Sequence, residues 1–150
     1  MSVIVYSGSP NIPHIPGGMV PNTSTTYTKD TLVDLTFGSA YISESTSSST
    51  THTIFGIMTD KTVTTAASSP VNLDVVPLGY GPQHLYIVDC TNNTAANQLY
   101  ARQALTNSST IANTSSDTTG NTGVFVPIAQ VGAATDKKLL GYFLGPLGTN

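Results

Sequence analysis

Few residues of this 150-residue chain carry the side chains on which catalysis or metal binding usually depends. The three histidines, His14, His52 and His84, do not stand at an HxH or HExxH spacing, so a metal site would need ligands from distant segments. The glycines do not form a phosphate-binding loop, and the serines do not form a GxSxG nucleophile elbow. The sequence therefore predicts neither a metal site nor a cofactor.

Cys90 is the single cysteine, and it follows Asp89 at the end of an apolar run. A helix that begins directly after it could lower the pKa of the thiol and make it a nucleophile. The pattern places no base beside it, so an inert, half-buried cysteine is the expected state. One cysteine also excludes an internal disulfide. We predict that the protein is not an enzyme; the alternative is a hydrolase that uses Cys90 or a serine with one of the histidines.

Carboxylates and glycosylation signals are equally uninformative about chemistry. Glu44 is the only glutamate, and Asp30 with Asp34 either share a strand face or line a solvated edge. Four Asn-x-Ser/Thr triplets begin at Asn22, Asn92, Asn107 and Asn113. A chain with 24 Thr, 16 Ser and 10 Asn contains such triplets by chance, so they do not indicate a glycoprotein.

The composition excludes several classes of partner. Charged residues make up 9% of the chain, against about 25% in a typical soluble domain, and the net charge is -3. Five Lys and Arg are too few to neutralise the phosphates of a duplex, so we expect no nucleic-acid partner. Neither a run of about 18 apolar residues nor a basic leader at MSVIVYSGSP is present, so we expect no membrane span and no signal peptide.

Residues 1–28 are predicted to form an extended N-terminal arm, and residues 29–150 a single β-rich domain. Between Ser7 and Asn22 four prolines and three glycines disfavour helix and predict polyproline-like or irregular extended chain. The apolar side chains of the arm cannot build a core alone, so they dock on this chain's own barrel or on a neighbour. The candidate contact residues of the arm are Pro10, Ile12, Pro13, Ile15, Pro16, Met19 and Val20.

Strand-like runs rich in β-branched and aromatic residues follow the arm. Residues 31–37 alternate with period two, which predicts a half-buried strand, and residues 40–43 predict another. The segment 43–52, SESTSSSTTH, is polar and of low complexity. It predicts a hairpin loop or a strand edge exposed to water.

Two pairs of runs predict hairpins. Residues 53–58 and 61–65 are separated by two residues, which suits a tight turn. Residues 124–131 and 138–145 are the most apolar runs, and the GAATDK segment between them also suits a hairpin. Pro127 cannot donate to a ladder, so it predicts an edge position or a bulge.

One short α-helix is expected over residues 91–105, with Asn93 or Thr94 as its N-cap and a length of about three turns. Residues 106–123 predict a loop with a short edge strand around Ile111. With roughly seven to nine strands, the chain is predicted to be all-β: mainly β with one short α-helix, as a compact β-barrel or β-sandwich with an extended N-terminal arm.

The Pro/Gly-rich apolar arm followed by strands rich in Thr, Ala, Asn and Gly resembles the small head decoration (cement) proteins of tailed bacteriophages. The C-terminal half, NNTAANQLYARQALTNSSTIANTS and then TGVFVPIAQVGAATDKKLLGYFL, resembles short virion proteins encoded near major capsid proteins. The resemblance implies a β-rich homo-oligomer, with a trimer favoured over a dimer. It implies binding to the outer surface of the major capsid protein lattice, after synthesis in the bacterial host cytoplasm. No catalytic residue transfers from such a family.

The residues themselves fit that role, because a sheet-rich body with few charges loses little hydration energy when its surface is covered. The arm can add main-chain hydrogen bonds to an exposed sheet edge, and its prolines reduce the entropy lost on ordering. We therefore predict a virion structural protein that decorates and stabilises the capsid. The alternative is a virion-associated fibre or tail module that binds a host-surface glycan through Tyr and Asn side chains.

Overall fold

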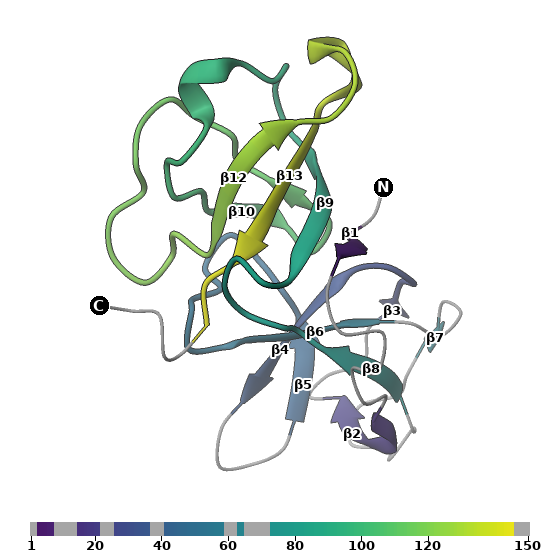
Figure 1. Ribbon diagram of the computed structural model, residues 1–150. Helices are drawn as coiled ribbons and strands as arrows, with labels where there is room; N and C mark the ends of the chain where they lie inside the picture. The colour runs from purple at the N-terminus through teal and green to yellow at the C-terminus, as the bar shows by residue number, and fades with distance from the viewer. Residues whose placement is uncertain are drawn as a thin grey trace.

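The predicted all-β fold is confirmed, with 43% of residues in strands, 6% in helical turns and no helix of seven residues or more in the described part of the chain. The computed structural model describes residues 3–7, 15–21, 26–36, 41–58, 63–64 and 73–145. Two β bodies lie one above the other in Figure 1, a six-stranded sheet and a closed barrel. Thirteen strands occur in the described part, more than the seven to nine expected.

The barrel closes in the order β2-β5-β4-β6-β8. Its strands are β2 (Ile15–Pro21), β4 (Leu32–Thr36), β5 (Tyr41–Glu44), β6 (Ile54–Met58) and β8 (Leu73–Pro77). The contact between β2 and β5 is parallel, and the other contacts are antiparallel. Closure removes the free sheet edges that an open sheet of this size would expose.

The tight hairpin predicted between residues 53–58 and 61–65 is wrong. Both edges of β6 are occupied by β4 and β8, which close the barrel. β7 (Val63–Thr64) instead pairs with β3 (Thr26–Tyr27) in a separate two-stranded ladder. The short spacing along the sequence favoured residues 61–65 as the partner of β6. In the barrel β6 pairs instead with β4 and β8, which are longer strands than β7.

The sheet runs in the order β10-β11-β9-β13-β12, and β1 also pairs with β9. Its strands are β1 (Val3–Ser7), β9 (Leu85–Cys90), β10 (Leu105–Asn107), β11 (Thr110–Ile111), β12 (Phe125–Gln130) and β13 (Lys138–Phe143). The predicted β12–β13 hairpin is confirmed. Pro127 lies in the last strand of the order, where the register shifts between Pro127 and Ala129, as an edge or bulge proline should.

The buried side chains form two groups, one within the barrel and one that joins the barrel to the sheet. The smaller fills the barrel: Tyr27, Val33, Ile42, Met58 and Val75. The larger joins barrel residues such as Leu32 and Ile57 to the aromatic centre of the sheet. There the ring of Phe143 makes edge contacts with Tyr86 and Phe125 at centroid distances of 5.2 and 5.0 Å. Because Leu32 and Val33 are both buried, the start of β4 is covered on two faces and not half-buried as predicted.

The α-helix predicted over residues 91–105 is wrong. This segment contains a single 3-10 turn, η1 (Ala96–Gln98), and its last residue already belongs to β10. Tyr100 has a φ of 66°, which ends any right-handed helix at that point. The amide of Gln98 also accepts the N–H of Ala95 at 3.0 Å, so side chains replace the helical bonds.

The described parts of residues 1–28 belong to both bodies of the same chain. β1 pairs with β9 in the sheet, whereas β2 pairs with β5 and β8 in the barrel. Residues 15–21 are therefore a strand, and not the polyproline-like or irregular chain that the prolines predict. The register of β2 against β8 shifts between Ile15 and Met19, and this stretch holds Pro16, which lacks an N–H, and two glycines.

Candidate binding surface

Four of the seven predicted arm contact residues lie in the barrel wall. Ile15, Pro16, Met19 and Val20 belong to β2, whose backbone faces β8 on one side and β5 on the other. This segment cannot leave the barrel without opening it. The remaining three, Pro10, Ile12 and Pro13, lie outside the described residues.

The candidate catalytic residues lie on separate elements. His52 is exposed in the loop before β6, His84 is half-buried just before β9, and His14 lies outside the described residues. Cys90 is only 4% exposed, at the end of β9. Burial, and then the charge of Asp89, raise the pKa of its thiol to about 12. Residues 91–105, all of which the structure describes, contain no α-helix to oppose this shift, so the thiol stays protonated at neutral pH and is a poor nucleophile.

The hydroxyl-rich loop 45–53 is organised around Asp34. It connects β5 to β6, which lie on either side of β4 in the barrel order. From β4, the Asp34 carboxylate accepts the hydroxyls of Ser45 and Ser49, each at 2.6 Å, and that of Thr53 at 3.2 Å. We call these four residues the Asp34 cluster. The predicted hairpin is wrong, since β5 and β6 do not pair. The predicted exposure to water holds for residues 46–48 and for His52, whereas Ser45, Ser49 and Thr51 are buried.

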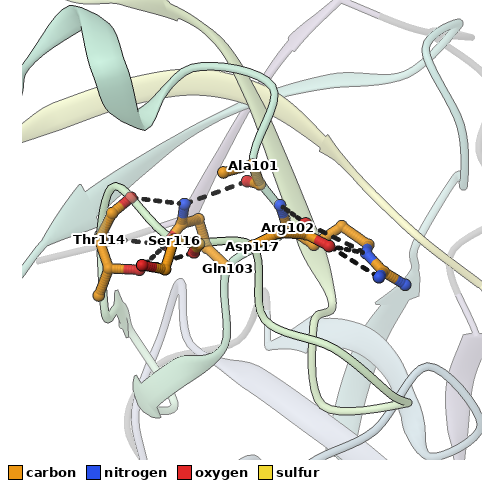
Figure 2. A network of polar contacts seen from close by, with 6 residues as sticks. All are labelled: Ala101, Arg102, Gln103, Thr114, Ser116 and Asp117. Atoms are coloured by element: carbon orange, nitrogen blue, oxygen red, sulfur yellow. Dashed lines mark hydrogen bonds and ion pairs between the residues drawn. The ribbon is translucent and has the colours of Figure 1, made fainter.

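The loops at the edge of the sheet are held by buried amides. Gln103 is fully buried, and its Nε2 donates to the carbonyls of Ala101 at 3.1 Å and Thr114 at 3.0 Å. Its Oε1 accepts the backbone N–H of Thr114 at 2.9 Å, so one side chain ties two loop segments together (Figure 2). Buried amides that are fully paired in this way make a unique loop conformation more stable than its alternatives.

Asn113 makes a second buried junction. Its Nδ2 donates to the carbonyl of Asn92 at 3.1 Å and to Oε1 of Gln98 at 3.0 Å, and its Oδ1 accepts the N–H of Asn92 at 2.9 Å. The nitrogen that a glycan would modify is therefore engaged inside the protein, and Asn113 is 1% exposed. Together with Gln103 we call these side chains, Gln98, Gln103 and Asn113, the amide network.

An exposed ion pair closes the same region. Arg102 donates to both carboxylate oxygens of Asp117, through Nε at 3.2 Å and Nη2 at 2.8 Å, and its backbone N–H donates at 2.6 Å (Figure 2). These hydrogen bonds lower the pKa of Asp117 and raise that of Arg102. The two charges cancel, so this part of the surface carries little net charge.

Tyr100 projects from this ordered region. It is 73% exposed, and among residues 26–35, 42–58 and 75–145, whose side-chain burial the structure describes, no other large apolar side chain is exposed. Its backbone N–H donates to the carbonyl of Pro127 at 2.7 Å, which fixes the segment against β12. Tyr100 falls within the helix predicted over residues 91–105, and the sequence offered no signal that this residue would be exposed after a 3-10 turn.

Comparisons with protein-family models, with curated proteins and with solved structures found no match to this chain. Among the residues that the structure describes, no helix is long and apolar enough to cross a membrane. The same residues contain no group of three or more His, Cys, Asp or Glu side chains placed to hold a metal ion. Function must therefore be inferred from the geometry of this chain.

Proposed function

We propose that this protein is a virion structural protein, a capsid decoration subunit that binds the outer surface of the major capsid protein lattice and stabilises the head. The observation that carries the proposal is the ordering of its hydroxyl-rich loops from within. The Asp34 cluster holds the loop over the barrel, and the amide network holds the loops beside the sheet. The result is a set of preformed loops that expose hydroxyls, such as those of residues 46–48, and few charges.

Such a surface suits adhesion to another protein. Its loops are already ordered, so binding loses less conformational entropy than binding by flexible loops would. Its charges are few, so most of the surface can be covered without removing a charged group from water. Hydroxyls and backbone groups can then exchange water for partner hydrogen bonds.

Many copies make weak contacts sufficient. We infer a homo-oligomer, with a trimer favoured, from the resemblance to head decoration proteins. In such an oligomer several linked contacts would raise avidity by about 10²–10⁴ without any new contact type. In the arm, the backbone of residues 15–21 is committed to the barrel. Residues 15–21 therefore cannot add a strand to a capsid sheet edge, and the arm contacts that we keep for the test are Pro10, Ile12 and Pro13, which lie outside the described residues.

The experiment mixes the purified chain with undecorated heads of the phage that encodes it and counts the copies bound per head by electron microscopy. We expect saturable binding of many copies at equivalent lattice positions. Binding should weaken in an Ile12→Asp variant. Deleting residues 1–20 is a poor test, because it removes β1 and most of a barrel strand. Heads that stay bare at saturating wild-type protein would contradict the proposal.

A further inference from the structure

We propose that the outer face of the sheet is the surface through which two copies of this chain pair. The outer face is the side of β9, β13 and β12 that points away from the buried core. The inference goes beyond the proposed function, because two copies can pair, and be measured, without a capsid. A two-fold contact of this kind predicts a dimer, whereas the resemblance to decoration proteins favours a trimer.

The two central strands of this face are apolar on both sides. Val88 of β9 pairs with Leu139 of β13, and both belong to the buried core. Ile87 pairs with Leu140 one residue further along, and because side chains alternate along a strand, these two lie on the opposite face, where both are half-buried. An antiparallel sheet with one face in water normally carries polar residues on that face. This sheet instead has a second apolar face that a partner can cover.

The apolar character continues over three strands. Leu85 on β9 and Tyr142 on β13 follow the same alternation, and Val126 on β12 pairs with Tyr142. In the part of the chain that the structure describes, the half-buried apolar residues packed against the core of the sheet are Tyr80 and Leu99. The side chains of the outer face are therefore not part of that core.

The charges on this face fit a second copy of the chain. Lys138 and Asp89 are cross-strand partners on the same face as Ile87 and Leu140, and Nζ of Lys138 donates to Oδ1 of Asp89 at 2.6 Å. A two-fold axis that runs parallel to the strands, midway between β9 and β13, lays β9 of each copy over β13 of the other. Each Asp89 then faces the partner's Lys138, and each Ile87 faces the partner's Leu140. This reciprocal matching is what an isologous contact requires.

The second copy therefore brings both the apolar patch and the correctly placed opposite charges, whereas an unrelated partner would have to supply both independently. Three strands of six residues, about 4.8 Å apart and with a rise of about 3.4 Å per residue, make a face of roughly 300 Å². A standard stable interface buries about 800 Å² per partner. We therefore expect a reversible dimer that forms as the protein concentration rises.

The test is the molecular mass of the purified chain in solution, measured by sedimentation equilibrium over a range of concentrations. Wild type should change reversibly from monomer to dimer. Leu140→Asp places a carboxylate in the middle of the face of each copy and should weaken the dimer by about 100-fold or more. Thr106→Asp is the matched control, because Thr106 is exposed on β10 of the same sheet, and it should dimerise like wild type. Thermal melts establish that each variant is folded.

A pair of charge reversals tests the two-fold arrangement itself. Asp89→Lys leaves two lysines on the face of each copy, and Lys138→Asp leaves two aspartates, so each variant should repel its own copies. In a mixture of the two variants, opposite charges face each other, and one-to-one dimers should form. Leu140→Asp keeps the inference testable where a charge reversal prevents folding, because Leu140 lies outside the core.

The outcomes separate this inference from the proposed function. Wild-type protein that is still monomeric at about 1 mM would overturn the pairing, as would a trimer or a dimer that Leu140→Asp leaves intact. A monomeric wild type whose binding to heads is lost in Leu140→Asp would make the capsid protein the partner of this face. Dimers that do not bind heads would overturn the proposed function and leave the pairing in place.

Discussion

The two hydroxyl-rich regions of the molecule reach the same order by different chemistry. Over the barrel, the loop 45–53 is drawn onto one carboxylate, Asp34, that only accepts hydrogen bonds. Beside the sheet, the segments between β9 and β12 are joined by neutral amides that both donate and accept. A carboxylate suits a loop whose side chains are hydroxyl donors, and amides suit a loop that must be tied through its backbone.

This difference in burial predicts which of the two regions loses more stability when a side chain is removed. The Asp34 carboxylate is only part-buried, so water can replace a lost hydroxyl partner there. Gln103 and Asn113 are almost completely buried, so a lost amide leaves backbone groups that water cannot reach. Unpaired buried groups cost more than exposed ones, and the sheet loops should therefore respond more strongly to mutation.

The largest effect is expected for Gln103→Ala. The change leaves the N–H of Thr114 and two carbonyls without partners and opens a cavity, which should reduce the free energy of unfolding by about 2–4 kcal/mol. Urea unfolding at pH 7 measures it. The exposed Asn97→Ala is the control, with a change within about 0.5 kcal/mol. Equal effects of the two variants would show that the amide network does not order these loops.

A smaller effect is expected in the barrel. Asp34→Ala removes an acceptor of three hydroxyls and should reduce the free energy of unfolding by about 2 kcal/mol. Ser49→Ala removes one donor to Asp34 and the acceptor of the Thr46 N–H, and should reduce it by about 1 kcal/mol. Ser47→Ala is the matched control, because Ser47 is exposed in the same loop. The same urea titration serves for all three. If Ser47→Ala were as costly as Ser49→Ala, the carboxylate would not be what organises the loop.

The regular parts of the fold follow from pattern, and the loops that order the surface do not. The β12–β13 hairpin and the position of Pro127 could be predicted, because alternation, turn residues and the missing proline N–H are local signals. The partner of β6 could not, since barrel closure depends on strands far along the chain. Runs of serine and threonine usually indicate an exposed segment. Here Ser45 and Ser49 are buried because they donate to Asp34 on β4, a contact that the sequence does not reveal.

The error at residues 91–105 shows the same limit at the candidate site. Alanine, leucine and glutamine there favour a helix, but Gln98 and Gln103 use their amides on loop backbone, and Tyr100 leaves the right-handed region. Side-chain hydrogen bonds to segments near residue 114 override the local propensity. The exposure of Tyr100 depends on that override, so no property of its immediate neighbours could have predicted it.

The two regions are also expected to differ in how their stability depends on pH. In the sheet loops this dependence comes from Asp117. The hydrogen bonds from Arg102 lower the pKa of Asp117 in the folded state. A lowered carboxylate pKa stabilises the fold at neutral pH, and this contribution disappears as the pH falls through the lowered value. Asp117→Asn should therefore melt slightly below wild type at pH 7, with a difference that 1 M salt reduces. Thermal melts at pH 7 in low and high salt test it; a difference that salt leaves unchanged would argue against the ion pair.

Next to the loop 45–53 of the barrel, an ionised carboxylate is expected to have the opposite effect on stability. Glu44 ends β5, directly before the Asp34 cluster, and burial raises the pKa of its carboxyl. A raised pKa means that the ionised group destabilises the folded state at neutral pH, and this cost disappears as the pH falls below the ordinary range of glutamate. Glu44→Gln should therefore melt slightly above wild type at pH 7 and at the same temperature at pH 3. A rise in melting temperature for Glu44→Gln and a fall for Asp117→Asn at pH 7 would confirm that the ionised carboxylate destabilises the fold at Glu44 and stabilises it at Asp117. A lower melting temperature for Glu44→Gln than for wild type at pH 7 would mean that the ionised Glu44 carboxylate is favourably paired. The carboxylates of Glu44 and Asp117 would then affect stability in the same direction, against the prediction.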